Sequence, residues 1–138
     1  MILNRPSLIN FGSMGSSELG YISVAEGNKL FPFQIKRVYW TYFTPQNVIR
    51  GRHAHRRLEQ IIFAISGVID CETEMIDGEI IRFRLDEPNM GLFLPINCWR
   101  EMKFSHAAVL MCLASMEYDE TDYIRDYSEF KKVRENEN

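Results

Sequence analysis

The chain has 138 residues, of which 46% are hydrophobic and 25% are charged. This is the balance of an ordinary globular protein, and the length suits one domain with a working core, so a mainly disordered chain is excluded. The net charge of -3 excludes the basic footprint of a nucleic-acid-binding protein, although a few local arginines could still hold a small anion.

Short strands separated by turns are predicted along most of the chain. Each has the alternation, or the β-branched and aromatic content, that is typical of strands, and glycine, proline, asparagine or aspartate stands between them. The predicted strands are residues 8–11, 21–25, 33–43, 60–66, 68–74, 79–85, 91–94, 99–104 and 107–114. Residues 12–20 are small and polar and are predicted to form a loop. Asp77-Gly78 is a strong hairpin signal between two of the strands.

The pattern changes in the last twenty residues. Four apolar or aromatic side chains are spaced there as on one face of a helix, and Asp119 or Thr121 could cap its first turn. The four are Tyr123, Ile124, Tyr127 and Phe130. We therefore predict a helix over residues 118–132.

This order of elements is typical of an all-β protein, a β-sandwich or small barrel with one short C-terminal helix. No internal repeat or second domain is visible, so we expect one domain over residues 1–138. The strand edges of such a domain need protection, and a homodimer is one way to provide it. The N-terminal strands and loop, residues 1–34, are the part that such a dimer would exchange.

The cysteines and the N-terminus indicate the compartment. Cys71, Cys98 and Cys112 are an odd number and lack the Cys-x-x-Cys spacing of zinc sites, so we expect reduced, mostly buried thiols and a cytoplasmic location. Residues 1–12 contain no apolar run long enough for a signal peptide or a membrane-spanning helix.

Two of the three histidines, His53 and His55, lie in the stretch 50–60, just before the apolar run 61–65. Side chains two apart on a strand point to the same face, so this pair aims either into a cavity or out to water. Because the apolar run belongs in a core, we predict that the pair stands at the mouth of that core. Paired imidazoles there could move protons between adjacent atoms of one substrate. The alternative is a pair of surface histidines at a strand end.

The order His-x-His, apolar strand, glycine resembles the first motif of the cupins. Metal-binding cupins add a carboxylate after the histidines and a third histidine on a later strand. Here those two positions fall on Gln60 and Arg100, and Glu59 would serve only after a one-residue slip of register. A guanidinium is always protonated and cannot bind a metal. We therefore expect no metal and suggest that Arg100 holds an anion or stabilises a developing oxyanion.

Four other side chains are candidates for the site. Tyr39 and Arg37 alternate on one predicted strand, although a strand tyrosine is more often part of a core than catalytic. Trp99 could be a stacking wall for a base or sugar, or simply a buried side chain. Arg37 and Arg50 could grip a phosphate bidentately, or be ordinary surface arginines.

Several separated motifs, in the right order, resemble one family. They are Ile35-Lys36-Arg37-Val38-Tyr39, Arg50-Gly51-x-His53-Ala54-His55, Leu58-Glu59-Gln60, Asp77-Gly78, Gly91-Leu92, Trp99-x-Glu101-Met102, Leu113-Ala114-Ser115 and the stretch 118–127. These motifs are similar to those of the sugar 3,4-ketoisomerases, cupin enzymes that act on dTDP-4-keto-6-deoxyglucose. The resemblance covers residues 35–130.

The resemblance implies a metal-independent, homodimeric cupin without a cofactor that converts dTDP-4-keto-6-deoxy-D-glucose to its 3-keto isomer. Such products feed a PLP-dependent aminotransferase on the way to 3-amino-3,6-dideoxy sugars of surface glycans such as lipopolysaccharide. Arg100 stands where the family divides by C4 configuration, on the glucose-like side. Leu19 departs from the residue expected at the accompanying loop position, so both configurations stay open.

The resemblance also implies roles. His53 or His55 would carry the carbon-bound proton and the other would relay protons between the two oxygens, with Tyr39 assisting. Arg100 would stabilise the enediolate or steer the sugar. The predicted substrate contacts are Arg37 and Arg50, for the diphosphate, together with Gln60 and Trp99. The competing functions are a dTDP-sugar 3,5-epimerase-like cupin, a non-catalytic nucleotide-sugar sensor and a metal-dependent dioxygenase.

Overall fold

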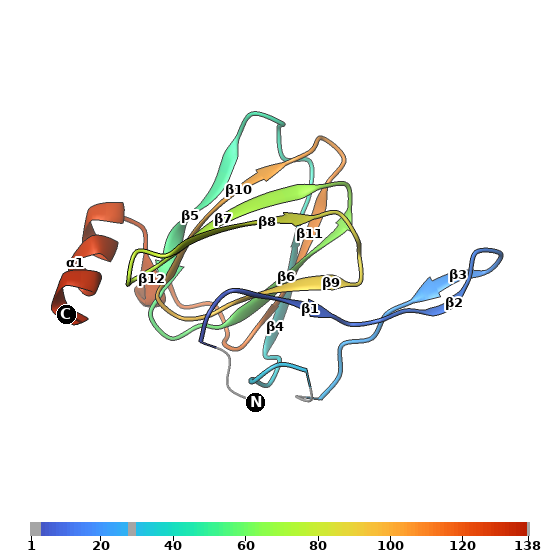
Figure 1. Ribbon diagram of the computed structural model, residues 1–138, viewed down its shortest axis with the longest axis horizontal. Helices are drawn as coiled ribbons and strands as arrows, with labels where there is room; N and C mark the ends of the chain where they lie inside the picture. The colour runs from blue at the N-terminus through green and yellow to red at the C-terminus, as the bar shows by residue number, and fades with distance from the viewer. Residues whose placement is uncertain (1–3, 28–29, 138) are drawn as a thin grey trace.

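Two five-stranded antiparallel sheets face each other in the computed structural model of the chain, which describes residues 4–27 and 30–137 (Figure 1). One sheet has the order β1-β9-β6-β11-β4 and the other β12-β5-β10-β7-β8. The strands are β1 (Ser7–Asn10), β2 (Met14–Ser16), β3 (Gly20–Ile22), β4 (Arg37–Thr41), β5 (Ile49–His55), β6 (Gln60–Ser66), β7 (Ile69–Met75), β8 (Ile80–Leu85), β9 (Met90–Leu94), β10 (Cys98–Phe104), β11 (Val109–Ala114) and β12 (Tyr123–Ile124). The predicted all-β sandwich is confirmed.

The space between the two sheets is filled by the inward side chains of alternating strands. In β7, for example, Ile69, Cys71, Thr73 and Met75 are buried, while Asp70 between them is exposed. Burial of one face is what fixes the register of such strands, because a slip of one residue would turn the apolar set outward. The three cysteines are free and buried, as predicted.

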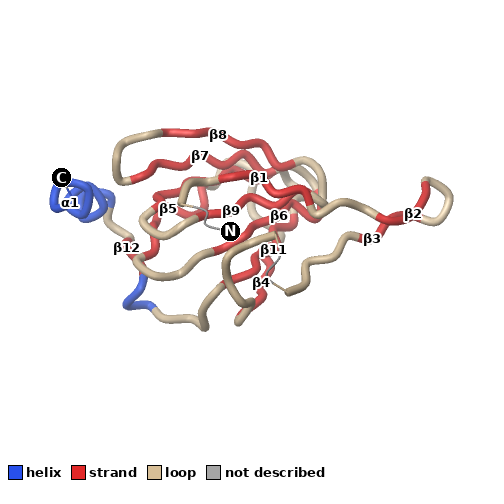
Figure 2. The backbone as a smooth tube through the Cα atoms, turned by 60° about the horizontal axis from the view of Figure 1, so that its bottom comes forward, coloured by secondary structure: helices blue, strands red, loops and turns tan. Residues whose placement is uncertain are grey.

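The outer faces of the sheets are covered differently. Over the first sheet, Phe31 and Phe33 pack on Ile61, Phe63 and Phe93, forming a second apolar cluster. Over the second sheet lies the helix α1 (Tyr127–Glu137), which Figures 1 and 2 both show at the end of the molecule next to β12 and β5. Within the described part of the chain, no helix has the length and apolar character that crossing a membrane requires.

The predicted C-terminal helix is wrong in its first half. Residues 120–122 form a short 3-10 helix, η1 (Glu120–Asp122), capped by Asp119, and Tyr123 and Ile124 form β12, which pairs with His55 and Ala54 of β5. The helix begins only at Tyr127. The spacing of the aromatic residues fits a helical face. The strand is nevertheless favoured over a helix, because pairing with the open edge of β5 satisfies backbone groups and still buries Ile124.

The N-terminal predictions also need correction. Residues 12–20, expected to be a loop, include β2 and the start of β3, which pair as a hairpin. The strand expected over residues 21–25 ends at Ile22, and that expected over 33–43 is only β4 (Arg37–Thr41). Phe33 lies before β4 and packs in the apolar cluster on the outer face of the first sheet.

A β-bulge interrupts the pairing of β5 with β10. Arg100 lies opposite His53 and Glu101 opposite Gly51, so Arg52 is the extra residue. Gly51 has φ +88°, and a Cβ there would lie 2.9 Å from the carbonyl oxygen of Arg100, so only glycine fits this close approach. The bulge sets the direction of the two histidines that follow it.

Candidate active site

The two histidines at the end of β5 point together into the sandwich, as predicted. Their ring centroids are 4.8 Å apart and the rings are nearly perpendicular. His55 is buried and His53 is half-buried. The ring of Tyr123, on the neighbouring β12, covers both, at 4.3 Å from His55 and 5.0 Å from His53. The surface-pair alternative is therefore excluded.

The Nδ1 atom of each imidazole has a hydrogen-bond partner. The Nδ1 atom of His53 lies 2.9 Å from the carbonyl oxygen of Gly51, which the bulge turns toward the ring. A carbonyl only accepts, so Nδ1 of His53 carries the proton and Nε2 carries the lone pair. The Nδ1 atom of His55 lies 3.2 Å from Oδ2 of the buried Asp122. Nε2 of His55 is buried and has no hydrogen-bond partner among the described residues.

A chain of polar contacts crosses the sandwich beside the histidines. Arg100, inward-facing on β10, donates from Nη1 to Oε1 of Gln60 on β6. The amide of Gln60 donates in turn to the hydroxyl of Tyr39 on β4, at 3.0 Å. Arg100 is 1% exposed, and no carboxylate lies within ion-pair distance of it among the described residues. Its Nη2 is buried and also lacks a hydrogen-bond partner in that part of the chain.

Burial and the positive charge of Arg100 control the charge of the two histidines. Burial, followed by the positive charge of Arg100, lowers the pKa of His53 to about 3, and the same two causes lower the pKa of His55 still further. Burial raises the pKa of Tyr39 well above its ordinary value. At neutral pH the two imidazoles and the phenol of Tyr39 are therefore neutral beside the cationic guanidinium of Arg100.

The half-buried side of the cluster is rich in arginine and tyrosine. The guanidinium of Arg37, on the same face of β4 as Tyr39, lies 5.4 Å from the Tyr39 ring and 5.7 Å from the Tyr118 ring. Arg125 stacks on Tyr123 at 4.0 Å. Nε of Arg37 is buried without a partner among the described residues. This side combines cations with aromatic faces where the cluster approaches solvent.

The structure brings together six of the eight predicted site residues and leaves two outside. The six are His53, His55, Tyr39, Arg100, Gln60 and Arg37. Trp99 points the other way from Arg100, because successive residues of a strand face opposite sides, and it packs under α1 against Tyr127 and Phe130. The prediction that Trp99 walls the substrate site is thus wrong, and the packing alternative holds. Arg50 is exposed on β5 beyond the bulge, opposite Met102.

Sequence reasoning missed three residues of this site, Asp122, Tyr123 and Arg125. All three come from the segment assigned to a helix, where they would have lain far from the histidines. The available signal was that this segment belongs to the motifs shared with a known family. The pairing of β12 with β5 is what brings these residues to the histidines.

The donor set does not suit a metal ion. In residues 4–27 and 30–137, no three His, Cys, Asp or Glu side chains are arranged to hold one. Gln60 and Arg100 fill the positions beside the two histidines, and the fixed positive charge of Arg100 would repel a cation.

Comparisons with known proteins agree with this geometry. The family described as "FdtA: WxcM-like, C-terminal" matches residues 4–135. The chain is 44% identical, over 91% of its length and 89% of the relative's, to the TDP-4-oxo-6-deoxy-alpha-D-glucose-3,4-oxoisomerase of Aneurinibacillus thermoaerophilus.

Two solved structures have the same fold. The sugar 3,4-ketoisomerase QdtA of Thermoanaerobacterium thermosaccharolyticum, in complex with TDP, superposes with a TM-score of 0.90 at 34% identity, covering 99% of this chain and 98% of that one. The TDP-quinovose 3,4-ketoisomerase WlaRB of Campylobacter jejuni superposes with a TM-score of 0.86 at 38% identity, covering 94% and 99%.

Proposed function

The chain belongs to the FdtA family of sugar 3,4-ketoisomerases, and from this premise we propose that it is an isomerase converting dTDP-4-keto-6-deoxy-D-glucose to the 3-keto isomer. The observation that carries the proposal is the pair of neutral imidazoles, His53 and His55, beside the buried guanidinium of Arg100, whose Nη2 has no hydrogen-bond partner among the described residues. This set can move protons and stabilise an oxyanion without a metal.

The reaction needs two proton transfers. The 4-ketone acidifies the hydrogen on C3, and the Nε2 lone pair of one histidine removes that proton as the electron pair moves onto O4. The resulting enediolate accepts a proton at C4 as O3 loses its own and becomes the new ketone. One proton thus moves from C3 to C4 and one from O3 to O4, so atoms and electrons balance. Two imidazoles side by side provide one carrier for each proton.

The surrounding groups fit the charge that develops. The enediolate oxygen is negative, and a buried guanidinium in a weakly polar interior stabilises it more than water would. Arg100 is the candidate for this role, held by Gln60 and by the carbonyl of Cys98. Tyr39, which keeps its proton, can donate to an oxygen of the sugar while its own oxygen accepts from Gln60.

We propose that Arg37 binds the diphosphate. It is half-buried, its Nε has no partner among the described residues, and it lies beside the tyrosines at the solvent side of the cluster. A guanidinium in that position can hold two phosphate oxygens at once. Arg50, which is exposed, remains only a sequence-based candidate for the same group.

The test is an incubation with dTDP-4-keto-6-deoxyglucose in deuterated water, followed by NMR. We expect conversion to the 3-keto isomer with an unlabelled C5; deuterium at C4 would show that the proton held by the histidine exchanges with water before it reaches C4. Label at C3 and C5 would make the protein an epimerase, and binding without any conversion would make it a sensor; either result overturns the proposal. Adding an aminotransferase of known stereochemistry traps the 3-keto product and reveals its C4 configuration.

We further propose that the protein works as a homodimer that exchanges the N-terminal residues 1–34. The β2–β3 hairpin extends away from the sandwich in Figures 1 and 2, and Tyr21 and Ile22 on it are exposed. The edge strand β4 is open and carries Trp40, which is 63% exposed. Leu19 lies between β2 and β3, at the end of the molecule opposite β12. It could therefore contact the histidine site of a second copy, but not that of its own chain.

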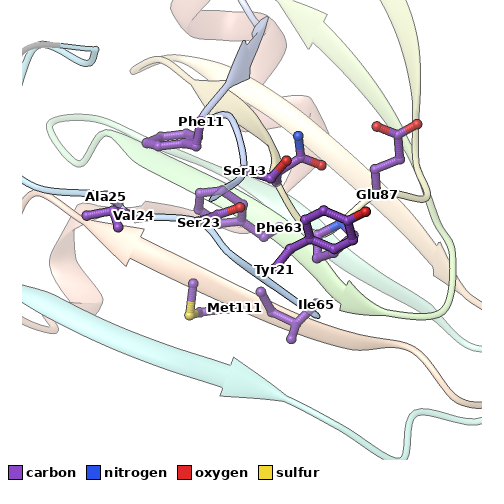
Figure 3. A pocket seen from close by; sticks show the side chains of 12 residues that line it. Phe11, Ser13, Tyr21, Ser23, Val24, Ala25, Phe63, Ile65, Glu87 and Met111 are labelled. Carbon is purple, nitrogen blue, oxygen red and sulfur yellow. The ribbon is translucent and has the colours of Figure 1, made fainter. Parts of the chain in front are cut away.

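A cavity of about 420 Å³ at the base of the hairpin supports the dimer (Figure 3). It is lined in part by Tyr21, Phe63, Ile65 and Met111, on the outer face of the first sheet. Apolar space of this kind suits side chains of a second copy. Trp40→Glu should shift the sedimentation coefficient to that of a monomer, whereas Ile80→Glu, at an exposed position of the other sheet, should not.

The free, buried state of all three cysteines supports a cytoplasmic location. Labelling with a thiol reagent after rapid denaturation of cells would find three thiols; a disulfide would contradict it.

A further inference from the structure

Asp122 is the least expected member of the cluster. It immediately precedes β12, 67 positions beyond His55 in the chain, and its side chain is 2% exposed. Its Oδ2 lies 3.2 Å from Nδ1 of His55, and no other carboxylate of the described residues contacts either histidine. A buried carboxylate against a buried imidazole is costly unless both are fully hydrogen-bonded.

The carboxylate of Asp122 is indeed well supplied with donors. Its Oδ1 accepts from the backbone N–H of Arg57 at 2.7 Å, and its Oδ2 accepts from that of Leu58 at 3.2 Å. The guanidinium of Arg57 lies 3.5 Å from Oδ1. These donors keep the group as an acceptor toward His55, so Nδ1 of His55 is the donor and Nε2 bears the lone pair.

We propose that Asp122 is a positioning residue that holds His55 in the tautomer and orientation needed for proton transfer. The same carboxylate stabilises the imidazolium that forms when Nε2 of His55 takes a proton. That help matters here because burial and Arg100 both oppose a positive charge on this ring. His53 differs, since its Nδ1 donates to the neutral carbonyl of Gly51.

The assignment makes the two histidines unequal. Both present Nε2, but within the described part of the chain only His55 has an anion within hydrogen-bonding distance, next to which it can become charged. Asp122 also ties together the turn that joins β5 to β6, because its backbone carbonyl accepts from Arg56 N–H and its side chain accepts from the next two N–H groups. A substitution there must therefore be separated from a loss of structure.

The role of Asp122 rests on the proposed function, so the experiment tests the two separately. Nitrogen-15 NMR of the histidine side chains in the wild-type protein reports the tautomer directly, whatever the activity. We expect His55 to be protonated at Nδ1. Protonation at Nε2 would overturn the assignment, even if no variant of Asp122 folds. A wild type that does not isomerise dTDP-4-keto-6-deoxyglucose would overturn the proposed function instead and leave the NMR result standing.

Asp122→Asn keeps the size of the side chain and removes its charge. We expect kcat to fall by about 10²- to 10⁴-fold, as for other buried carboxylates behind a catalytic histidine, with KM changed less than about threefold. Asp119→Asn is the matched control, because Asp119 caps the same 3-10 helix and pairs with Arg57 without touching His55. A folded Asp122→Asn variant with wild-type kcat would overturn the assignment, as would an equal loss in Asp119→Asn.

Discussion

The interior of the sandwich has a polar half, around Arg100, and an apolar half, around Met102 and Phe104, and the same strands contribute to both. Along β10 the inward side chains are Cys98, Arg100, Met102 and Phe104, in regular alternation. Around Met102 and Phe104 the neighbours are apolar, whereas around Arg100 they are imidazole, amide and phenol groups. The bulge at Gly51 lies where one half changes into the other.

This difference separates stability from function. In the apolar half, burial of side chains such as Leu85 and Leu110 removes hydrocarbon from water and favours folding. In the polar half, Arg100 and His55 are buried with one nitrogen each left without a partner among the described residues, which disfavours folding. The buried polar groups of the polar half thus lower the stability of the fold and remain free to bind a ligand. The apolar half provides the stability that compensates for them.

The sharpest way to test this division is to remove an imidazole. His53→Asn or His55→Asn should reduce kcat by about 10²- to 10⁴-fold, because each takes away one of two proton carriers, while the fold persists. Turnover and thermal unfolding measured on the same samples would check this. His106→Asn, at the exposed third histidine, is the control and should be unchanged. Normal turnover in either variant would remove that histidine from the mechanism.

Arg100→Met should lower activity without lowering stability. We expect kcat to fall by about 10²- to 10³-fold, since the oxyanion loses its cation, and the free energy of unfolding to stay level or rise, since a buried charge is replaced by an apolar chain. Urea denaturation and steady-state kinetics measure both. Lys103→Met, exposed on the same strand, is the control. A strongly destabilised variant with full activity would mean that Arg100 serves stability and not function.

The opposite result is expected in the apolar half. Leu110→Ala should lower the free energy of unfolding by about 2–5 kcal/mol through lost burial and a cavity. Turnover by the folded protein should change less than about threefold, because Leu110 has no part in the polar cluster. Urea denaturation measures the free energy of unfolding, and steady-state kinetics under conditions in which the variant stays folded measure turnover. Ile80→Ala, at an exposed residue, is the control. A large loss of kcat would mean that the two halves are coupled.

The smallest effect on turnover is expected from pH, which should act on stability. The pKa of His53 falls from 6.5 to about 3 on folding, so between these values the unfolded chain binds a proton that the folded chain does not. The resulting stability is present above pH 6.5 and is lost as the pH falls toward 3, at up to about 1.4 kcal/mol per pH unit.

Urea denaturation from pH 4 to 8 would test this against His53→Asn, which lacks the group. The difference in free energy of unfolding, wild type minus variant, should be constant above pH 6.5 and decrease below it. A difference independent of pH would mean that His53 is protonated as easily in the folded protein as in the unfolded one.

Much of the fold was predictable because strands are encoded locally. Strand β6 was predicted with its observed bounds, since it is a buried apolar run ended by Gly67, and the Asp77-Gly78 hairpin joins β7 to β8. The pairing of His53 with His55 on one face followed from the two-residue period of a strand. Gln60 and Arg100 were placed beside them only through the resemblance to the cupins, because contacts between β6 and β10 cannot be read from spacing along the chain.

What the sequence by itself determined is therefore the alternation that makes a sandwich and the chemical groups that face its interior. What only the tertiary structure decided is which distant groups meet: that Tyr123 and Ile124 form a strand beside β5, that Asp122 contacts His55, and that Trp99 turns away from the site. The reason is physical. Local periodicity is set by the geometry of the chain, whereas the edge of β5 on which β12 pairs and the buried contact between Nδ1 of His55 and Asp122 exist only once the sheets have formed.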